Sequence, residues 1–162
     1  MKARGFLADA VQGAEGKLSA LGAGWNHLSA PGFPARHDRI GLALILTFEA
    51  SEAGQHNVEL QLLGPKDLPS VLFSGPDGSE RFAINAMIEV QPPADGFTEV
   101  SIPVAINLDG LTFPEAGPYA FAVRVDGQDA ERLNFGVGLA PGADGSQGLT
   151  SSGRPPTDAG YL

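Results

Sequence analysis

The sequence contains no cysteine, few aromatic residues and only ten lysine and arginine residues against nineteen acidic ones. Without cysteine the chain has no disulfide, thiolate metal site or cysteine nucleophile, and this absence leaves the cellular compartment undecided. The formal net charge of −9 opposes binding to phosphate backbones and anionic lipid, and the basic residues are scattered along the chain. We therefore expect no nucleic-acid partner and no membrane partner.

Long apolar runs and common catalytic motifs are also missing. No run approaches the roughly 18 apolar residues that a membrane helix requires. The short apolar run near the amino end is broken by Asp9, unlike the core of a secretory leader, so cytoplasmic location is the default prediction. The patterns G-x-S-x-G, H-E-x-x-H and G-x-x-x-x-G-K-S/T do not occur. We therefore expect no enzyme, no cofactor and no metal site.

The clearest pattern present is a hairpin over residues 117–139, in which two alternating segments flank Asp126-Gly127. The apolar residues all have odd numbers: Tyr119, Phe121, Val123, Val125, Leu133, Phe135, Val137 and Leu139. Cross-strand partners share a face, so odd positions must pair with odd positions. A plain two-residue turn would place Phe121 opposite Arg132. The sequence therefore predicts a three- or five-residue loop, or a β-bulge.

Other segments have the period-two pattern or the apolar content of strands. The predicted strands are residues 4–12, 17–28, 40–48, 58–62, 82–90 and 100–108, with a short edge piece at 72–73. Glycines within 17–28 suit a bent or bulged strand. Residues 40–48 are continuously apolar and predict a central strand covered on both faces. Pro103 cannot donate a hydrogen bond to a sheet, so its strand should be an edge strand or contain a bulge.

Asp-Gly pairs recur along the chain at Asp77-Gly78, Asp95-Gly96, Asp109-Gly110, Asp126-Gly127 and Asp144-Gly145. The first four lie between or beside predicted strands, which is typical of turns. Their carboxylates could in principle supply oxygen ligands to calcium. None lies in the D-x-D-x-D-G arrangement of a calcium loop, and turn chemistry is the preferred interpretation.

From Ala140 onward glycine, proline and serine replace large apolar residues, which predicts a flexible, disordered tail over residues 140–162. The remaining residues, 1–139, are expected to form one domain. Its short, half-buried strands predict an all-β fold, an antiparallel immunoglobulin-like β-sandwich of about eight or nine strands.

Two segments also carry a family resemblance. The opening FLADAVQGAEGKLSALGAGWNHL and the closing GPYAFAVRVDGQ resemble the two ends of an uncharacterised bacterial domain family of unknown function. Its members begin with a similar Leu-Ala-Asp stretch, followed by Gly-Lys-Leu and a glycine-rich turn. The resemblance covers nearly all of residues 4–139 and implies a β-sandwich fold, and it supplies no catalytic residues.

Three residues are candidates for ligand binding: Trp25, His27 and Tyr119. An exposed Trp25 could stack on a sugar ring, whereas a buried one would belong to the core, which we favour. The histidines lack the spacing of zinc ligands, so solvated loop positions are the preferred interpretation. The leading hypothesis is a non-enzymatic interaction or assembly module that binds another protein or itself. The alternative is a small-ligand or carbohydrate-binding module.

Overall fold

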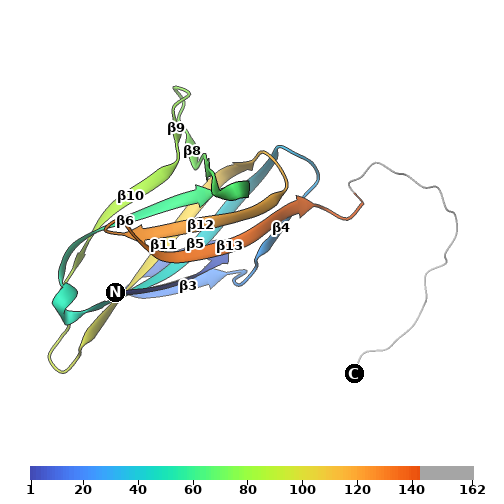
Figure 1. The fold of residues 1–162 in the computed structure, drawn as a ribbon. Helices are drawn as coiled ribbons and strands as arrows, with labels where there is room; N and C mark the ends of the chain where they lie inside the picture. Colours follow the sequence, from blue (N-terminus) through green and yellow to red (C-terminus); the bar gives the residue numbers. More distant parts are fainter. Residues whose placement is uncertain (143–162) are drawn as a thin grey trace, which may run out of the picture.

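The computed structural model describes residues 1–142 of the chain (Figure 1). These residues form thirteen β-strands and two 3-10 turns, with no α-helix. The strands are β1 (Lys2–Ala8), β2 (Ala10–Ala14), β3 (Lys17–Leu21), β4 (His27–Ala30), β5 (Ala35–Glu49), β6 (Gly54–Leu63), β7 (Pro69–Ser70), β8 (Phe73–Ser74), β9 (Glu80–Arg81), β10 (Ala83–Val90), β11 (Glu99–Phe113), β12 (Gly117–Val125) and β13 (Gln128–Leu139). The turns are η1 (Ala50–Glu52) and η2 (Pro65–Asp67). The predicted tail lies outside the described residues, except for its first three.

Two sheets pack face to face. One has the order β1-β5-β11, and the other has the order β10-β6-β12-β13-β4, with β7 also paired to β6 (Figure 1). Neighbours within the sheets are antiparallel, apart from the parallel pair of β13 and β4. The hairpins β2–β3 and β8–β9 lie outside these sheets. No helix in the described part is long and apolar enough to cross a membrane.

The prediction of an all-β, mainly antiparallel fold is confirmed, although the strands are more numerous than expected because hairpins and two-residue strands were not foreseen. The order β1-β5-β11 corresponds to strands A-B-E of immunoglobulin-like sandwiches, and the part β10-β6-β12-β13 of the larger sheet corresponds to C′-C-F-G, while β4 and β7 are additional. The immunoglobulin-like assignment remains a prediction that this order supports.

One core lies between the sheets. It combines the inward residues of β5, such as Leu42 and Leu44, with apolar residues of β6, β11, β12 and β13. Phe135 is its centre, because its ring lies 5.9 Å from the ring centroids of both Phe113 and Tyr119 and 5.4 Å from that of Phe121. Burying one such side chain stabilises the fold by roughly 1.5–3 kcal/mol.

The register of the β12–β13 hairpin confirms the prediction from odd-numbered apolar residues. Phe121 pairs with Leu133 and Tyr119 with Phe135, while Val125 pairs with Gln128 across the Asp126-Gly127 turn. The pairing of Phe121 with Leu133 and that of Val125 with Gln128 are both possible because the register shifts by one residue next to Val123. A bulge there inserts an extra residue into β13. The turn is thus a two-residue turn with positive φ at both positions. The bulge brings the odd-numbered apolar residues of β13 back to the face that packs on the core.

Several sequence predictions need correction. Residues 17–28 are not one bent strand, because β3 ends at Leu21 and positive φ angles at Gly22 and Gly24 turn the chain before β4. Residues 4–12 are likewise divided between β1 and β2. In β5 the residues from Ile40 to Leu44 are buried, but Ile45 is 44% exposed. The β2–β3 hairpin, which covers the outer face of this sheet, does not extend as far as Ile45.

Strand β11 provides one confirmation and one correction. It is an edge strand of its sheet, as Pro103 predicts. Asp109-Gly110 is not a turn between strands, although Gly110 has a φ of +69°. The strand continues because its pairing with β5 persists on both sides of Gly110, where Asp109 pairs with Arg39 and Leu111 with His37. The Arg39 guanidinium also donates to the Asp109 carboxylate, at 2.6 Å from Nε and 3.1 Å from Nη2. The turns at Asp77-Gly78 and Asp95-Gly96 are present as predicted.

The β2–β3 hairpin covers the outer face of the three-stranded sheet, where Val11 packs with Ala8 and Ala43 in a small separate cluster. The amide of Asn107 on β11 holds it, since Oδ1 accepts from the Val11 nitrogen at 3.0 Å and Nδ2 donates to the Val11 carbonyl at 2.8 Å. Gly41 permits the close approach. A Cβ there would lie 2.9 Å from the Ala10 carbonyl carbon and 3.0 Å from the Val11 nitrogen.

Gly41→Ala should therefore destabilise the domain by about 1–3 kcal/mol, because β2 must move away from β5. The measurement is urea unfolding followed by circular dichroism. Gly13→Ala is the matched control, since its added Cβ would make an ordinary 3.6 Å contact with the Cβ of Ala105. Equal stability of the two variants would contradict the close approach.

Tyr119 packs its ring in the core, and its hydroxyl donates a 2.8 Å hydrogen bond to the carbonyl of Glu115, four residues earlier. Immunoglobulin-like sandwiches have a tyrosine corner of this kind. Tyr119→Phe should keep the ring packing and cost about 0.5–1.5 kcal/mol, because the Glu115 carbonyl loses its donor. The melting temperature would then fall by several degrees, whereas an unchanged value would show that the hydroxyl contributes nothing to stability.

Candidate functional site

A groove of about 640 Å³ lies on the outer face of the larger sheet, across β13 between β4 and η2. We call it the His27 groove. The residues that matter for its chemistry are His27, Lys66, Asp67, Arg132, Asn134 and Gly136. They come together because even-numbered residues of β13 face outward when Phe135 and Val137 face the core. The register of the hairpin therefore determines which side chains of β13 line the groove.

The floor of the groove has little side-chain bulk. The His27 ring lies against the β13 backbone, where a Cβ added to Gly136 would be 3.1 Å from its Nδ1 and one added to Gly138 would be 3.3 Å from its Cε1. At the other side, a Cβ on Gly117 would approach Cγ of Pro65 to 2.9 Å. The glycines therefore let both His27 and the η2 turn lie close to the sheet.

The η2 turn carries two consecutive residues with left-handed backbone, Lys66 at a φ of +65° and Asp67 at +58°. Apart from glycine, asparagine and aspartate, residues rarely adopt this conformation, which costs about 1–2 kcal/mol, so the strain falls on Lys66. The turn is closed by the Gly64 nitrogen, which donates to the Leu68 carbonyl at 2.7 Å. It is also fixed from outside, because the Asp67 carboxylate forms an ion pair with Arg132.

Arg132 joins the turn to the sheet. Besides the ion pair with Asp67, its Nε donates to Oδ1 of Asn134 at 3.0 Å. The charge of Asp67 is thereby balanced, and the amide nitrogen of Asn134 is left to donate elsewhere. No sequence pattern indicated this pairing, since Asp67 and Arg132 are 65 residues apart. Only the Gly-Pro-Lys-Asp sequence of η2 could have indicated a turn.

The structure places the three sequence-predicted residues around this groove in different roles. His27 is exposed and lines the groove. Tyr119 borders it but is only 2% exposed, and burial raises the pKa of its hydroxyl. Trp25 is half-buried and does not line the groove, and its ring is edge-on to Phe135 at a centroid distance of 6.1 Å. Packing against the core is the role that we favoured for Trp25.

A second groove, of about 700 Å³, lies between the β8–β9 hairpin and the end of β11. We call it the Phe73 groove. Its main apolar side chains are Phe73 and Phe82, which are 37% and 43% exposed, and Pro69 and Pro114 also line it. Arg36 contributes a positive charge, and its guanidinium lies beside Gly110, since a Cβ there would be 3.0 Å from Nη2. This groove combines aromatic surface with one cation, and two acidic residues, Glu80 and Asp109, also line it.

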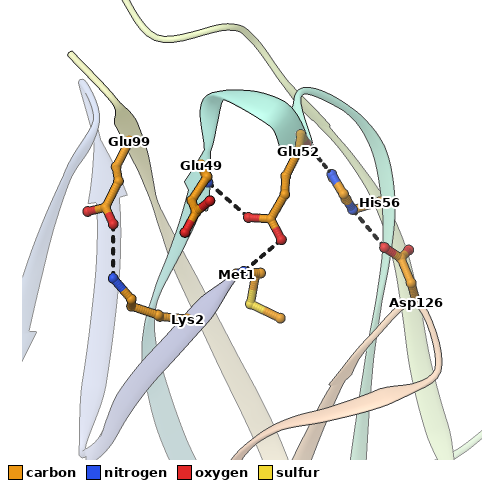
Figure 2. Close-up of polar contacts among 7 residues, drawn as sticks. All are labelled: Met1, Lys2, Glu49, Glu52, His56, Glu99 and Asp126. Carbon is orange, nitrogen blue, oxygen red and sulfur yellow. Dashed lines mark hydrogen bonds and ion pairs between the residues drawn. The ribbon is translucent and has the colours of Figure 1, made fainter.

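A polar network lies at the other end of β12 (Figure 2). His56 on β6 donates from Nδ1 to the Asp126 carboxylate at 2.7 Å and from Nε2 to the Glu52 carbonyl at 2.7 Å. Oδ1 of Asp126 also accepts from the Asn57 nitrogen. The side chain of Glu52 in turn bonds the Met1 ammonium and the Glu49 nitrogen. The network therefore ties the hairpin turn to η1 and to β1.

This network changes with pH. The hydrogen bond to Asp126 and then that to the Glu52 carbonyl raise the pKa of His56 above its ordinary 6.5. The bond from His56 and then that from the Asn57 nitrogen lower the pKa of Asp126 below its ordinary 3.8. Both groups are therefore charged in the window between these ordinary values. The stabilisation from His56 is complete below pH 6.5 and is lost as the pH rises through its raised folded-state value.

Three of the Asp-Gly carboxylates have partners within the domain. Asp77 accepts from the nitrogen and hydroxyl of Ser79, Asp109 pairs with Arg39, and Asp126 pairs with His56. Each of these bonds lowers the pKa of the aspartate concerned. Among residues 1–142 no group of three or more acidic or histidine side chains is arranged to hold a metal ion.

His56→Gln should destabilise the domain more at pH 5.5 than at pH 9, because only the imidazolium can donate to both acceptors. Urea unfolding at the two pH values measures the difference. Asp126→Asn is the partner for a double-mutant cycle, in which the coupling between the two sites should be present at pH 5.5 and smaller at pH 9. A cost of His56→Gln that is the same at both pH values would contradict the charged pair.

Comparisons with known proteins give a family and no activity. Among solved structures, the chain is similar to a Pseudomonas fluorescens alkylpurine DNA glycosylase, AlkC, bound to DNA containing an abasic site analog, with 14% identity and a TM-score of 0.38. The match covers 70% of this chain but only 28% of the glycosylase, and it carries no argument about function. No curated protein matches. A family of unknown function, DUF6941, matches residues 4–138, which confirms the resemblance found in the sequence, and the chain belongs to this family.

Proposed function

We propose that the domain is a non-enzymatic interaction module that binds an extended segment of a partner protein at the Phe73 groove, along the open edge of β11. The observation that carries this proposal is the position of two exposed aromatic side chains beside an edge strand.

The edge of β11 can accept another strand. Within residues 1–142 it pairs with β5 on one side and with no strand on the other. Exposed edges of this kind bind extended peptides by adding a strand, with affinity from main-chain hydrogen bonds and specificity from side-chain pockets. Pro103 blocks continuous pairing in the middle of β11. The part that borders the groove, from Asp109 to Thr112, is therefore the favoured segment.

The side chains of the groove indicate what the partner segment contains. Phe73 and Phe82 can bury an apolar side chain, and aromatic residues often dominate binding energy at interfaces. Arg36 has no ion pair in the described part of the chain, whereas its neighbour Arg39 is paired with Asp109. A free guanidinium favours a carboxylate. We therefore expect a segment with an apolar residue close to an acidic one.

Selection from a displayed library of random peptides tests the proposal. Wild-type protein should enrich peptides that pair an apolar with an acidic residue, and Phe73→Ser/Phe82→Ser should bind them at least about tenfold more weakly, since lost aromatic anchors often cost 1–2 kcal/mol or more. Phe97→Ser is the control, because Phe97 is 72% exposed but lies outside the groove. Enrichment that is equal for all three proteins would refute the Phe73 groove as the site.

A small-ligand-binding module is the second candidate function, and the hydrogen-bond donors of the His27 groove favour it. Sugar binding through Tyr119 has less support, because the ring is almost fully buried and cannot stack on a sugar. His27 remains available at the surface. A ligand there would be recognised mainly by polar and charged groups.

A further inference from the structure

We infer that the His27 groove binds a small anion through its oxygen atoms, either a carboxylate or a phosphate group, with Lys66, His27 and the Asn134 amide as donors. This inference deepens the second candidate function and is independent of peptide binding at the Phe73 groove. Its failure would leave the peptide proposal unaffected, since the two grooves share no lining residue.

The groove has more donors than acceptors. Asp67 is the one acidic residue among those that line it, and its carboxylate is paired with Arg132. Asn134 uses its carbonyl oxygen to accept from Arg132, so that its NH₂ group remains available as a donor. Neither Lys66 nor His27 forms an ion pair with another described residue. A site with this balance is complementary to an anionic oxygen group.

The η2 turn holds Lys66 in place at a cost in backbone energy. Lys66 and Asp67 both have left-handed φ angles, and asparagine or glycine would fit the first position with less strain. Strained backbone of this kind concentrates at binding and catalytic sites. The ion pair of Asp67 with Arg132 fixes the turn against β13, so the lysine is presented beside the groove before any ligand arrives.

The size and overall charge limit the class of ligand. The volume of about 640 Å³ and the glycine floor leave room for a small molecule against the sheet. A net charge of −9 repels long polyanions, whose many charges act beyond the groove. A small anion with one or two charges is screened from that repulsion at physiological ionic strength, where the Debye length is about 8 Å. The inference is therefore restricted to small anions.

Titrations followed by ¹⁵N–¹H correlation spectra test the inference. Sodium phosphate and sodium acetate are added in separate series, with sodium chloride replaced so that ionic strength stays constant. The expected result is saturable shifts of the backbone amides of His27, Asn134 and Gly136. Saturation by phosphate alone identifies a phosphate site, by acetate alone a carboxylate site, and by both a general oxyanion site. No saturation by either anion at 50 mM would overturn the inference.

Two variants separate binding from folding. Lys66→Asn should weaken the anion about three- to tenfold while keeping or raising the melting temperature, because asparagine tolerates left-handed backbone. Asn134→Asp keeps an acceptor for Arg132 and replaces the donor with a carboxylate, so it should abolish saturation. Lys17→Asn removes an equal charge at the exposed start of β3 and should leave the affinity unchanged. Equal weakening by Lys66→Asn and Lys17→Asn would indicate a non-specific attraction to positive charge and would overturn the site.

Discussion

The register of β13 is the constraint on which the rest of the structure depends. Phe135 must face inward, because its ring contacts aromatic residues from both β12 and β11 and so joins the two sheets. The bulge beside Val123 makes this possible with a two-residue turn at Asp126-Gly127. A slip by one residue would turn every side chain of β13 to the other face. The core and the outer groove would then be lost together.

The outer face follows from this register. Arg132, Asn134 and Gly136 are the residues between the inward ones, and they meet η2 on one side and His27 on the other. The packing of the inward residues therefore sets the positions of the outward polar side chains, although these lie on the other face of the sheet. The two proposed sites use different parts of the sandwich, since one lies on the face of the larger sheet and the other lies at the β11 edge of the smaller sheet.

Much of the fold could be predicted from the sequence, because apolar alternation over 117–139 and the position of Pro103 are local signals with direct structural meaning. The need for an odd-length loop or a bulge was predictable for the same reason, and the structure has the bulge. The Asp109-Gly110 pair was misread as a turn, because Asp-Gly is a local turn signal, whereas the pairing of β11 with β5 on both sides of Gly110 joins residues about 70 apart in the sequence. The exposure of Ile45 was not predicted, because the sequence around it does not show how far the β2–β3 hairpin covers β5.

The candidate site was predictable only in part. His27 and Tyr119 were identified as chemically interesting residues, and both border the groove. Lys66, Asp67 and Arg132 were missed, because their importance comes from a left-handed turn and a long-range ion pair. Neither the left-handed turn nor the long-range ion pair produces a periodic pattern in the sequence. The burial of Tyr119 follows from its odd-numbered, inward position in the hairpin, and that pattern already argued against a binding role for its ring.

The attachment of the β2–β3 hairpin has a consequence for how the molecule opens. The hairpin contacts the sandwich through its own small cluster, one asparagine amide and the backbone above Gly41, and contributes almost nothing to the main core. Such a unit can exchange its amide hydrogens by lifting off, at a lower free energy than global unfolding. The turn at Glu15 and Gly16, at its tip, is then the place where the chain best accommodates inserted residues or an attached label.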